Sequence, residues 1–242
     1  MTMTPTEPSS KHPRPAPAFA HVAVWIFDLD NTLYPASSRL FDQVDRRIGE
    51  FIAETFALDP AAARALQKHY FRTYGTTLRG LMSERGVDPH HFLDYVHRID
   101  RTALSPDPAL EAALARLAGR KLVFTNGSAD HAEKVMERLG ITHHFEAVFD
   151  VVAAGFLPKP DPACYRLLLE RHSIAPEAAA MVDDIARNLA PAHELGMTTV
   201  WLMADTPFST PGEEGAHIHH RASDLVAFLE AVAAARAAGP SG

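Results

Sequence analysis

VAVWIFDLDNTL, residues 22–33, joins six apolar residues to a turn that carries two aspartates. The run Val22–Phe27 shows no polar alternation, which is typical of a strand buried on both faces of a parallel sheet. Asp28 and Asp30 follow it directly. Ligands of such sheets bind outside the carboxyl ends of the strands, so both carboxylates are candidates for binding a metal or a reacting group. A polar turn with an aspartate as helix cap is the structural alternative.

Working outward, similar apolar runs alternate with helical patterns along the rest of the chain. Further strands are expected at Leu122–Thr125, Ala147–Val152, Ala180–Val182 and Thr198–Met203, and helices at Ala109–Leu117, Ala129–Leu139, Ala163–Arg171, Ile185–Leu195 and Ala227–Ala238. Strands that alternate with helices indicate an α/β fold with a doubly wound parallel sheet. We therefore predict a Rossmann-like core.

One segment, from about Arg39 to Leu104, breaks this alternation because it carries helical signals only. A helical insertion after the first strand predicts a cap on the α/β core. The expected organisation is a disordered tail at 1–19, a core at 20–36 and 105–235, a helical cap at 37–104 and a flexible tail at 236–242. The first tail is assigned from its Pro, Thr and Ser content.

Composition narrows the class of protein. The 242 residues are 47% hydrophobic and 22% charged, as in an ordinary globular protein, and the net charge is −7. Excess acid argues against nucleic acid as a partner, because binding its phosphates requires clustered Lys and Arg. No apolar run reaches the roughly 18 residues of a membrane span, and the single cysteine, Cys164, excludes an internal disulfide. We expect a cytoplasmic protein without membrane contact.

Three further expected strand ends carry polar residues. They contribute Thr125-Asn126-Gly127-Ser128, Lys159 in a proline-rich loop, and Asp183-Asp184. A hydroxyl and free N–H groups at a helix start can bind an anion, although Ser128 can also be a simple helix cap. Lys159 can equally be a surface lysine. Adjacent acids after an apolar run need a cation beside them, either a metal or Lys159.

Together, these strand ends place four acids, a lysine and anion-binding groups in one crevice. Carboxylates are suited to Mg²⁺, which typically binds one or two of them together with substrate phosphate. Lysine and helix-end amides neutralise phosphoryl oxygens. The combination predicts a small phosphorylated molecule as the partner.

The chain resembles the haloacid dehalogenase-like hydrolase superfamily, specifically its aspartate-nucleophile phosphatases. The match consists of DLDNTL at 28–33, TN at 125–126, KP at 159–160 and DD at 183–184, in the family's order and spacing. It covers roughly residues 21 to 230, and the helical insertion is similar to the family's cap of the first type.

This resemblance implies a role for each matching residue. Asp28 would be the nucleophile that forms an aspartyl-phosphate, and Asp30 the general acid and then the general base. Thr125 and the Asn126 amide would hold the phosphoryl group, and Lys159 would offset its charge.

The implied cofactor is Mg²⁺. It would lie between the Asp28 carboxylate, the Asp30 carbonyl and the Asp184 carboxylate. Asp183 would lie behind these ligands, although adjacent acids can exchange roles. Asn188 is the candidate for the motif's last polar position.

The cap suggests a substrate class. DLDNTLYP together with Tyr74–Leu81 (YGTTLRGL) resembles the pyrimidine 5′-nucleotidase branch. On this hypothesis Arg79 and the hydroxyl of Thr76 contact the nucleoside of a bound monophosphate. Alternatively, Gly75 and Gly80 only end helices and Arg79 is a surface charge.

Several alternatives remain open. A phosphatase of phosphoglycolate or a sugar phosphate, a phosphomutase and a non-catalytic phosphate-binding protein all fit the core motifs. Carbon–halogen hydrolysis is disfavoured because it needs no second acid, and Asp30 is present. The adjacent histidines, among them His143-His144, are interpreted as solvated because no acid lies at a familiar metal-ligand spacing. The chain is expected to be a monomer or a homodimer.

Overall fold

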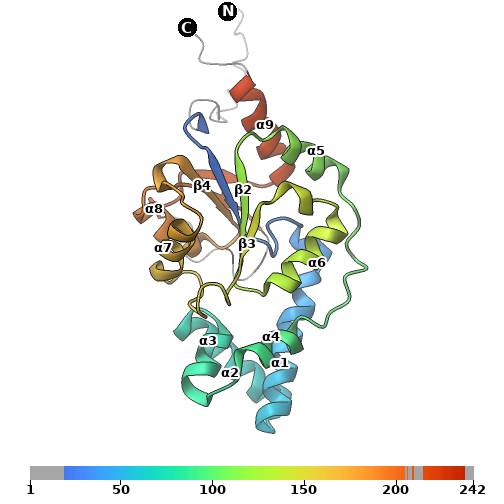
Figure 1. The fold of residues 1–242 in the computed structure, drawn as a ribbon. Helices are drawn as coiled ribbons and strands as arrows, with labels where there is room; N and C mark the ends of the chain where they lie inside the picture. The colour runs from blue at the N-terminus through green and yellow to red at the C-terminus, as the bar shows by residue number, and fades with distance from the viewer. Residues whose placement is uncertain (1–18, 205, 207–208, 210–214, 238–242) are drawn as a thin grey trace, which may run out of the picture.

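The computed structural model of the chain describes residues 19–204, 206, 209 and 215–237. Within them, a six-stranded sheet runs in the order β3-β2-β1-β4-β5-β6, with all neighbours parallel. Its strands are β1 (Val24–Phe27), β2 (Arg120–Phe124), β3 (Ala147–Phe149), β4 (Ala179–Asp183), β5 (Thr198–Leu202) and β6 (His220–Ala222). This is the strand order of a doubly wound Rossmann-like sheet, and the predicted fold class is confirmed (Figure 1).

Strand β1 is buried on both faces, as its sequence predicts. Trp25 and Phe27 join the apolar cluster on one face, and Val24 and Ile26 join that on the other, because successive side chains of a strand alternate. Helices α5 (Pro108–Arg116), α6 (Ala129–Leu139) and α9 (Leu225–Ala237) cover the first face, and α7 (Pro162–Arg171) and α8 (Leu189–Glu194) cover the second.

The helices after the first three core strands begin where the sequence predicts. Asp107 caps α5, Ser128 caps α6 and Asp161 caps α7, each by accepting a hydrogen bond from a backbone N–H of the first turn. Pro108 and Pro162 follow the two aspartates in the first turn, where the missing N–H has no intrahelical partner to lose.

The helix expected at Ile185–Leu195 is shorter than predicted. A 3-10 turn, η5 (Ala186–Asn188), precedes α8, which begins at Leu189. Pro191 explains the break. In a helix that began at Ile185 it would lie in the interior and remove a hydrogen bond, whereas in α8 it lies in the first turn.

The chain ends also differ from expectation. Phe19 was expected in the tail, but it is 1% exposed and its ring lies 5.5 Å from those of Trp25 and Phe228. Arg236 belongs to α9, and its guanidinium donates to the Val22 carbonyl at 2.8 Å. The rest of the two predicted tails, residues 1–18 and 238–242, lies outside the described residues.

The insertion after β1 folds as a helical cap. Its helices are α1 (Leu40–Phe56), α2 (Pro60–Tyr74), α3 (Thr77–Arg85) and α4 (Pro89–Val96), and they share an apolar cluster of their own that also takes in Val151 of the core. A Cβ on Gly80 would come within 2.4 Å of the Tyr70 ring, so glycine is required where α3 crosses α2. Figure 1 shows the cap below the sheet.

Short 3-10 turns complete the connections: η2 (Ala36–Ser38), η3 (Thr142–His144) and η4 (Pro176–Ala178). None of the helices in the described part of the chain is long and apolar enough to cross a lipid bilayer.

Candidate active site

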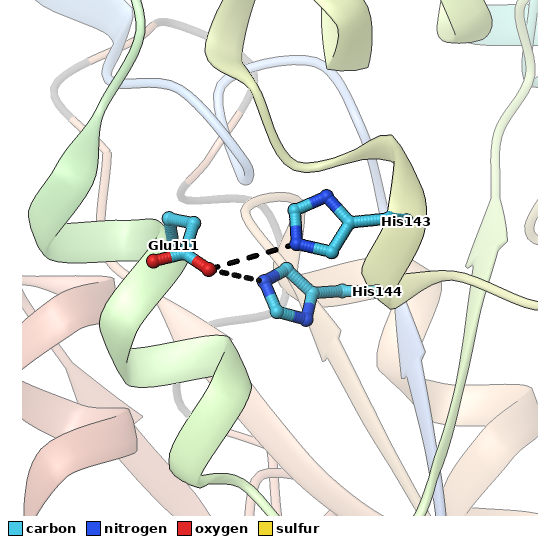
Figure 2. Close-up of side chains that lie close together, drawn as sticks. All are labelled: Glu111, His143 and His144. Atoms are coloured by element: carbon cyan, nitrogen blue, oxygen red, sulfur yellow. Dashed lines mark hydrogen bonds and ion pairs between the residues drawn. The ribbon is translucent and has the colours of Figure 1, made fainter.

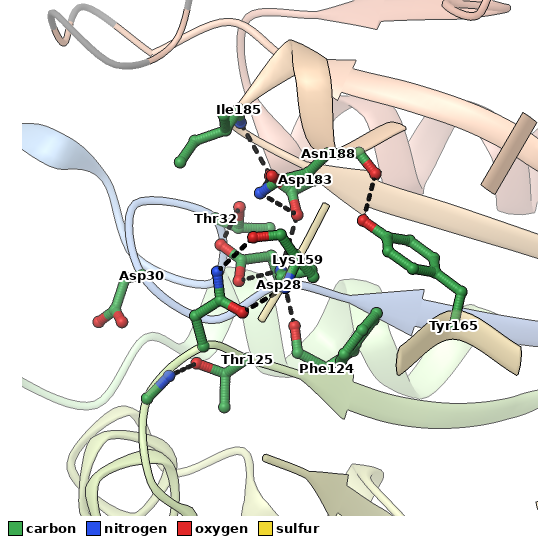
Figure 3. Close-up of polar contacts among 12 residues, drawn as sticks. Asp28, Asp30, Thr32, Phe124, Thr125, Lys159, Tyr165, Asp183, Ile185 and Asn188 are labelled. Carbon is green, nitrogen blue, oxygen red and sulfur yellow. Dashed lines mark hydrogen bonds and ion pairs between the residues drawn. The ribbon is translucent and has the colours of Figure 1, made fainter. Parts of the chain in front are cut away.

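Two neighbouring strands bring the predicted acids together. Strand β1 ends just before Asp28, whose N–H donates to the Val182 carbonyl of β4 at 2.9 Å. The chain order reverses between β1 and β4, which is where sheets of this type bind ligands. Lys159 reaches the same point from the loop before α7. Its Nζ donates to Asp28 Oδ1 and to Asp183 Oδ2, both at 2.7 Å (Figure 3).

Burial gives this cluster an unusual balance of charge. The carboxylates of Asp28, Asp183 and Asp184 are buried, with oxygens within 4.8 Å of one another. Burial raises the pKa of Asp28 to about 7, against the lowering effect of Lys159. Burial and then the charge of Asp28 raise the pKa of Asp184 well above its ordinary value.

Lys159 stays a cation in this setting. Burial alone would lower its pKa, but the charges of Asp183 and Asp28 outweigh burial and raise it. One buried cation therefore faces three buried acids. A divalent cation would supply the missing positive charge.

The adjacent acids at the end of β4 have different surroundings. Asp183 Oδ1 accepts hydrogen bonds from the Ile185 N–H at 2.8 Å and from the Asn188 amide at 3.0 Å, while Oδ2 faces Lys159. Asp184 lines the cavity beside the site, and its carboxylate accepts no hydrogen bond from the described residues. Asp184 is thus available as a metal ligand, whereas Asn188 holds the Asp183 carboxylate and Asp183 in turn orients Lys159.

Thr125 and Asn126 lie at the end of β2, before α6. Thr125 Oγ1 accepts the Gly127 N–H at 2.9 Å, and the residue lines the cavity, so its hydroxyl proton is available to a ligand. Asn126 also lines the cavity, and its side chain fixes the lysine loop. Its Oδ1 accepts the Lys159 N–H at 2.7 Å and its Nδ2 donates to the Lys159 carbonyl at 3.1 Å.

Asp30 is held by two side chains, Tyr34 and His131, that were not predicted as site residues from the sequence. The Tyr34 hydroxyl donates to Asp30 Oδ1 at 2.6 Å, and His131 Nε2 lies 3.0 Å from the same oxygen. His131 comes from the first turn of α6 and is fully buried. Burial alone would raise the pKa of Asp30, yet its contacts with His131 and Tyr34 lower it below the ordinary value.

Arg101 determines which nitrogen of His131 carries the proton. Its guanidinium can only donate, and Nη2 lies 3.2 Å from His131 Nδ1. Nδ1 is therefore the acceptor, and Nε2–H points at Asp30. The ring of His97 stacks on His131 with centroids 4.3 Å apart and planes inclined by 9°. Asp30 and His131 are 101 residues apart, so no short motif links them. The one sequence feature that could have pointed to His131 is its position in the first turn of a helix that starts at a strand end.

A cavity between the sheet and the cap contains these groups. Asp28, Asp30, Thr125, Lys159 and Asp184 line its core side. The cap side is mostly apolar and is lined by Phe41, Val44, Ile48, Phe71, Leu78, Phe92, Leu93 and Val96, with Gln67, Lys68, Thr76 and Thr77 among its polar members.

The two cap residues expected at the substrate lie in different places. Thr76 lines the cavity and caps α3, where its hydroxyl oxygen accepts the Arg79 N–H at 3.2 Å. Arg79 is not among the lining residues, and its guanidinium donates to the Phe156 carbonyl of the core at 3.2 Å. Successive helical residues point about 100° apart, so a helix that turns Thr77 and Leu78 to the cavity turns Arg79 away. In this structure Arg79 joins the cap to the core.

Known proteins resemble this chain in sequence and in fold. The family described as haloacid dehalogenase-like hydrolase matches residues 22–196. Phosphate metabolism protein 8 of Saccharomyces cerevisiae is 29% identical over 205 residues, covering 77% of this chain and 62% of that protein. Phosphoserine phosphatase of Thermus thermophilus is 35% identical over 99 residues, covering 39% of each. The chain thus spans less than two thirds of the length of either relative.

Another relative and a solved structure match over more of their length. Glyceraldehyde 3-phosphate phosphatase of Methanopyrus kandleri is 30% identical over 191 residues, covering 72% of this chain and 81% of that protein. The structure of L-2-haloacid dehalogenase from Xanthobacter autotrophicus superimposes with a TM-score of 0.54 at 16% identity, covering 86% of this chain and 97% of that one. At that identity the structural likeness concerns the fold alone.

Proposed function

The chain belongs to the haloacid dehalogenase-like hydrolases, and from this premise we propose that it is a phosphomonoester hydrolase with Asp28 as its nucleophile. The observation that carries the proposal is the pair of acids after β1. Asp28 contacts Lys159 at 2.7 Å and Asp30 is held separately by Tyr34 and His131, while both acids line one cavity. Relatives named as phosphatases add support.

In the first step a carboxylate oxygen of Asp28 attacks phosphorus. The bond from phosphorus to the leaving oxygen breaks, and Asp30 gives its proton to that oxygen. Lys159 Nζ and the Thr125 hydroxyl face the cavity beside Asp28 and offset the charge of the phosphoryl oxygens. The product of this step is an aspartyl-phosphate on Asp28 and the free alcohol.

In the second step water attacks the phosphorus of the aspartyl-phosphate, and Asp30 takes the proton of that water. The bond from phosphorus to the Asp28 oxygen breaks, which releases phosphate and regenerates the Asp28 carboxylate. The donors on Asp30 Oδ1 favour the ionised form that this step needs. A phosphate dianion beside Asp30 adds negative charge, which raises the pKa of the carboxyl and favours the protonated form needed in the first step. One carboxyl thus serves both steps.

Magnesium fits the donor set of the site. Asp184 is a buried carboxylate without a hydrogen-bond donor among the described residues, and its pKa is raised by burial and by Asp28; such a group favours a cation beside it. We assign the binding to the carboxylates of Asp28 and Asp184 and to the main-chain carbonyl of Asp30. When bound, Mg²⁺ would offset the negative charge of the phosphoryl group.

Asp30 also argues for phosphate esters over halides. A halide leaves without a proton, so carbon–halogen hydrolysis gains nothing from a second acid held in place. Here Tyr34 and His131 both contact one oxygen of Asp30. The arrangement is useful to a reaction whose leaving group is an alkoxide.

For the substrate we propose a nucleoside monophosphate with a pyrimidine or another single-ring base. The cap side of the cavity is lined mainly by apolar side chains, including Phe71 and Phe92, and a flat base can bury against them. The ring hydroxyls of a hexose phosphate that faced these apolar side chains would be left unpaired, and unpaired buried polar groups weaken binding strongly. Gln67, Lys68, Thr76 and Thr77 line the same side of the cavity, and we infer that they read the polar edge of the base.

A substrate panel tests the proposal. Phosphate release is measured with excess Mg²⁺ from UMP, CMP, AMP, phosphoglycolate, glucose 6-phosphate and p-nitrophenyl phosphate. The proposal expects UMP and CMP to show the highest kcat/KM among the natural esters. A preference for phosphoglycolate or the hexose phosphate would leave the phosphatase chemistry standing and overturn the substrate. Transfer of the phosphoryl group between two sugar positions would instead identify a mutase.

A further inference from the structure

A second cluster of titratable side chains lies outside the cavity just described. Glu111 belongs to the first turn of α5, and His143 and His144 form the end of η3. These histidines were expected to be solvated, because no acid lies at a familiar metal-ligand spacing from them in the sequence. Glu111 precedes His144 by 33 residues, and the fold brings it to both rings (Figure 2).

The three side chains converge on one point. His144 Nε2 lies 3.3 Å and His143 Nε2 lies 3.6 Å from the same oxygen, Glu111 Oε1. Ligand bonds of about 2.0–2.2 Å at a tetrahedral angle place two zinc ligands about 3.4 Å apart. The three candidate ligand atoms all lie within 4.8 Å of one another. These separations suit ligands of a single ion.

The cluster is partly pre-arranged and open on one side. The His144 side chain is 11% exposed, whereas those of Glu111 and His143 are 41% and 63% exposed. The two imidazole rings contact each other with centroids 4.1 Å apart. An ion can therefore enter from solvent and keep water at its remaining position.

We propose that Glu111, His143 and His144 form a binding site for a divalent ion that prefers imidazole, such as Zn²⁺. Imidazole nitrogens suit Zn²⁺, Ni²⁺ and Cu²⁺, whereas Mg²⁺ prefers oxygen ligands. The site is separate from the acidic cluster of the cavity, and none of its residues lines that cavity. A bound ion joins α5 to the turn after α6 and so stabilises the core.

The alternative is a carboxylate that accepts hydrogen bonds from both rings without any ion. Glu111→Gln distinguishes the two, because an amide oxygen still accepts hydrogen bonds but is a weak zinc ligand. Zn²⁺ is titrated calorimetrically into the full chain and into Asp184→Asn, both with Mg²⁺ in excess, so that any binding of Zn²⁺ to the acidic cluster is identified by its loss in the variant. We expect one Zn²⁺ per chain with a micromolar Kd and a higher Tm. Glu111→Gln should weaken binding by more than about tenfold, since even indirect metal partners are worth about 10–100-fold.

Matched variants complete the test. His143→Ala should lose zinc binding and leave phosphate release unchanged. His90→Ala and His91→Ala alter another adjacent pair, which joins no such three-residue group within the described residues, and should bind as wild type. The proposal is overturned if the wild-type chain does not bind Zn²⁺ in the micromolar range. It is also overturned if Glu111→Gln binds Zn²⁺ as tightly as wild type, or if His90→Ala or His91→Ala loses zinc binding while His143→Ala keeps it.

Discussion

Replacing His131 by alanine should slow the hydrolysis of alkyl phosphates much more than that of aryl phosphates. His131 supplies one of the two hydrogen bonds that Asp30 Oδ1 receives, and Tyr34 supplies the other. A hydrogen bond to a charged group contributes about 1.5–3 kcal/mol, which corresponds to roughly 10- to 150-fold in rate if the transition state loses all of it. This loss is at or below the lower end of the roughly 100- to 10,000-fold that general acid–base catalysis supplies, as expected when Tyr34 still contacts Asp30.

The assay compares kcat/KM for UMP, an alkyl ester, with that for p-nitrophenyl phosphate, an aryl ester, because this ratio reports the first step and the two esters share the second. An aryl leaving group needs little protonation, so its kcat/KM should change little, whereas that of UMP should fall. His131→Gln should recover part of the UMP rate, because its amide N–H can reach the same oxygen. Lys134→Ala is the control on the same helix, since Lys134 is exposed and pairs only with Asp130 among the described residues.

Thermal unfolding of each variant shows whether the fold is intact, which matters because His131 is fully buried. Equal losses of kcat/KM for the two esters would mean that His131 supports the fold of α6 and not the protonation of the leaving group. Wild-type kinetics in His131→Ala would mean that Tyr34 alone positions Asp30.

Three further predictions follow from buried groups. Asp184→Asn should weaken the binding of Mg²⁺, measured by calorimetry, far more than Asp183→Asn does. Asp183→Asn should lower Tm more, because Asp183 contacts Lys159. If Asp183→Asn weakened Mg²⁺ binding more, the roles of the two acids would be exchanged. Burial raises the pKa of the Cys164 thiol to about 12, so a thiol reagent at neutral pH should label it only after unfolding, and rapid labelling of the native chain would contradict this. Burial and then His131 lower the pKa of His97 to about 3, so between pH 6.5 and about 3 the unfolded chain binds a proton that the folded chain does not. The free energy of unfolding should therefore fall by up to about 1.4 kcal/mol per pH unit as the pH drops through this window. Denaturant titrations of His97→Gln should show a shallower fall, and identical slopes would refute the assignment.

The fold was largely predictable because its signals are local. Apolar runs marked β1 to β5, and Asp-Pro pairs marked two helix starts. Strand β6 was not predicted, because His220–Ala222 is three residues long and only one of them is apolar. Phe19 was assigned to the tail because nothing in its neighbourhood shows that it packs on Trp25 and Phe228, which lie in later elements.

The residues of the candidate site were likewise predictable only in part. Asp28, Lys159 and Asp183 could be brought together from the sequence, since strand order in a doubly wound sheet places their loops side by side. Tyr34 and His131 could not be assigned to Asp30, because hydrogen bonding depends on side-chain directions that spacing does not reveal. For the same reason Arg79 was expected at the substrate, whereas α3 turns it toward the Phe156 carbonyl.

The most direct test of the account is to identify the phosphorylated residue during turnover. The enzyme is mixed with UMP and Mg²⁺, quenched in acid and treated with borohydride, which reduces an aspartyl-phosphate to homoserine. Peptide mapping then locates the modified residue. With p-nitrophenyl phosphate, whose leaving group needs little protonation, the Asp30→Asn variant should accumulate more of it because its second step lacks a base. The account predicts homoserine at position 28 alone. Modification at another residue, or none at all while phosphate is being released, would contradict it.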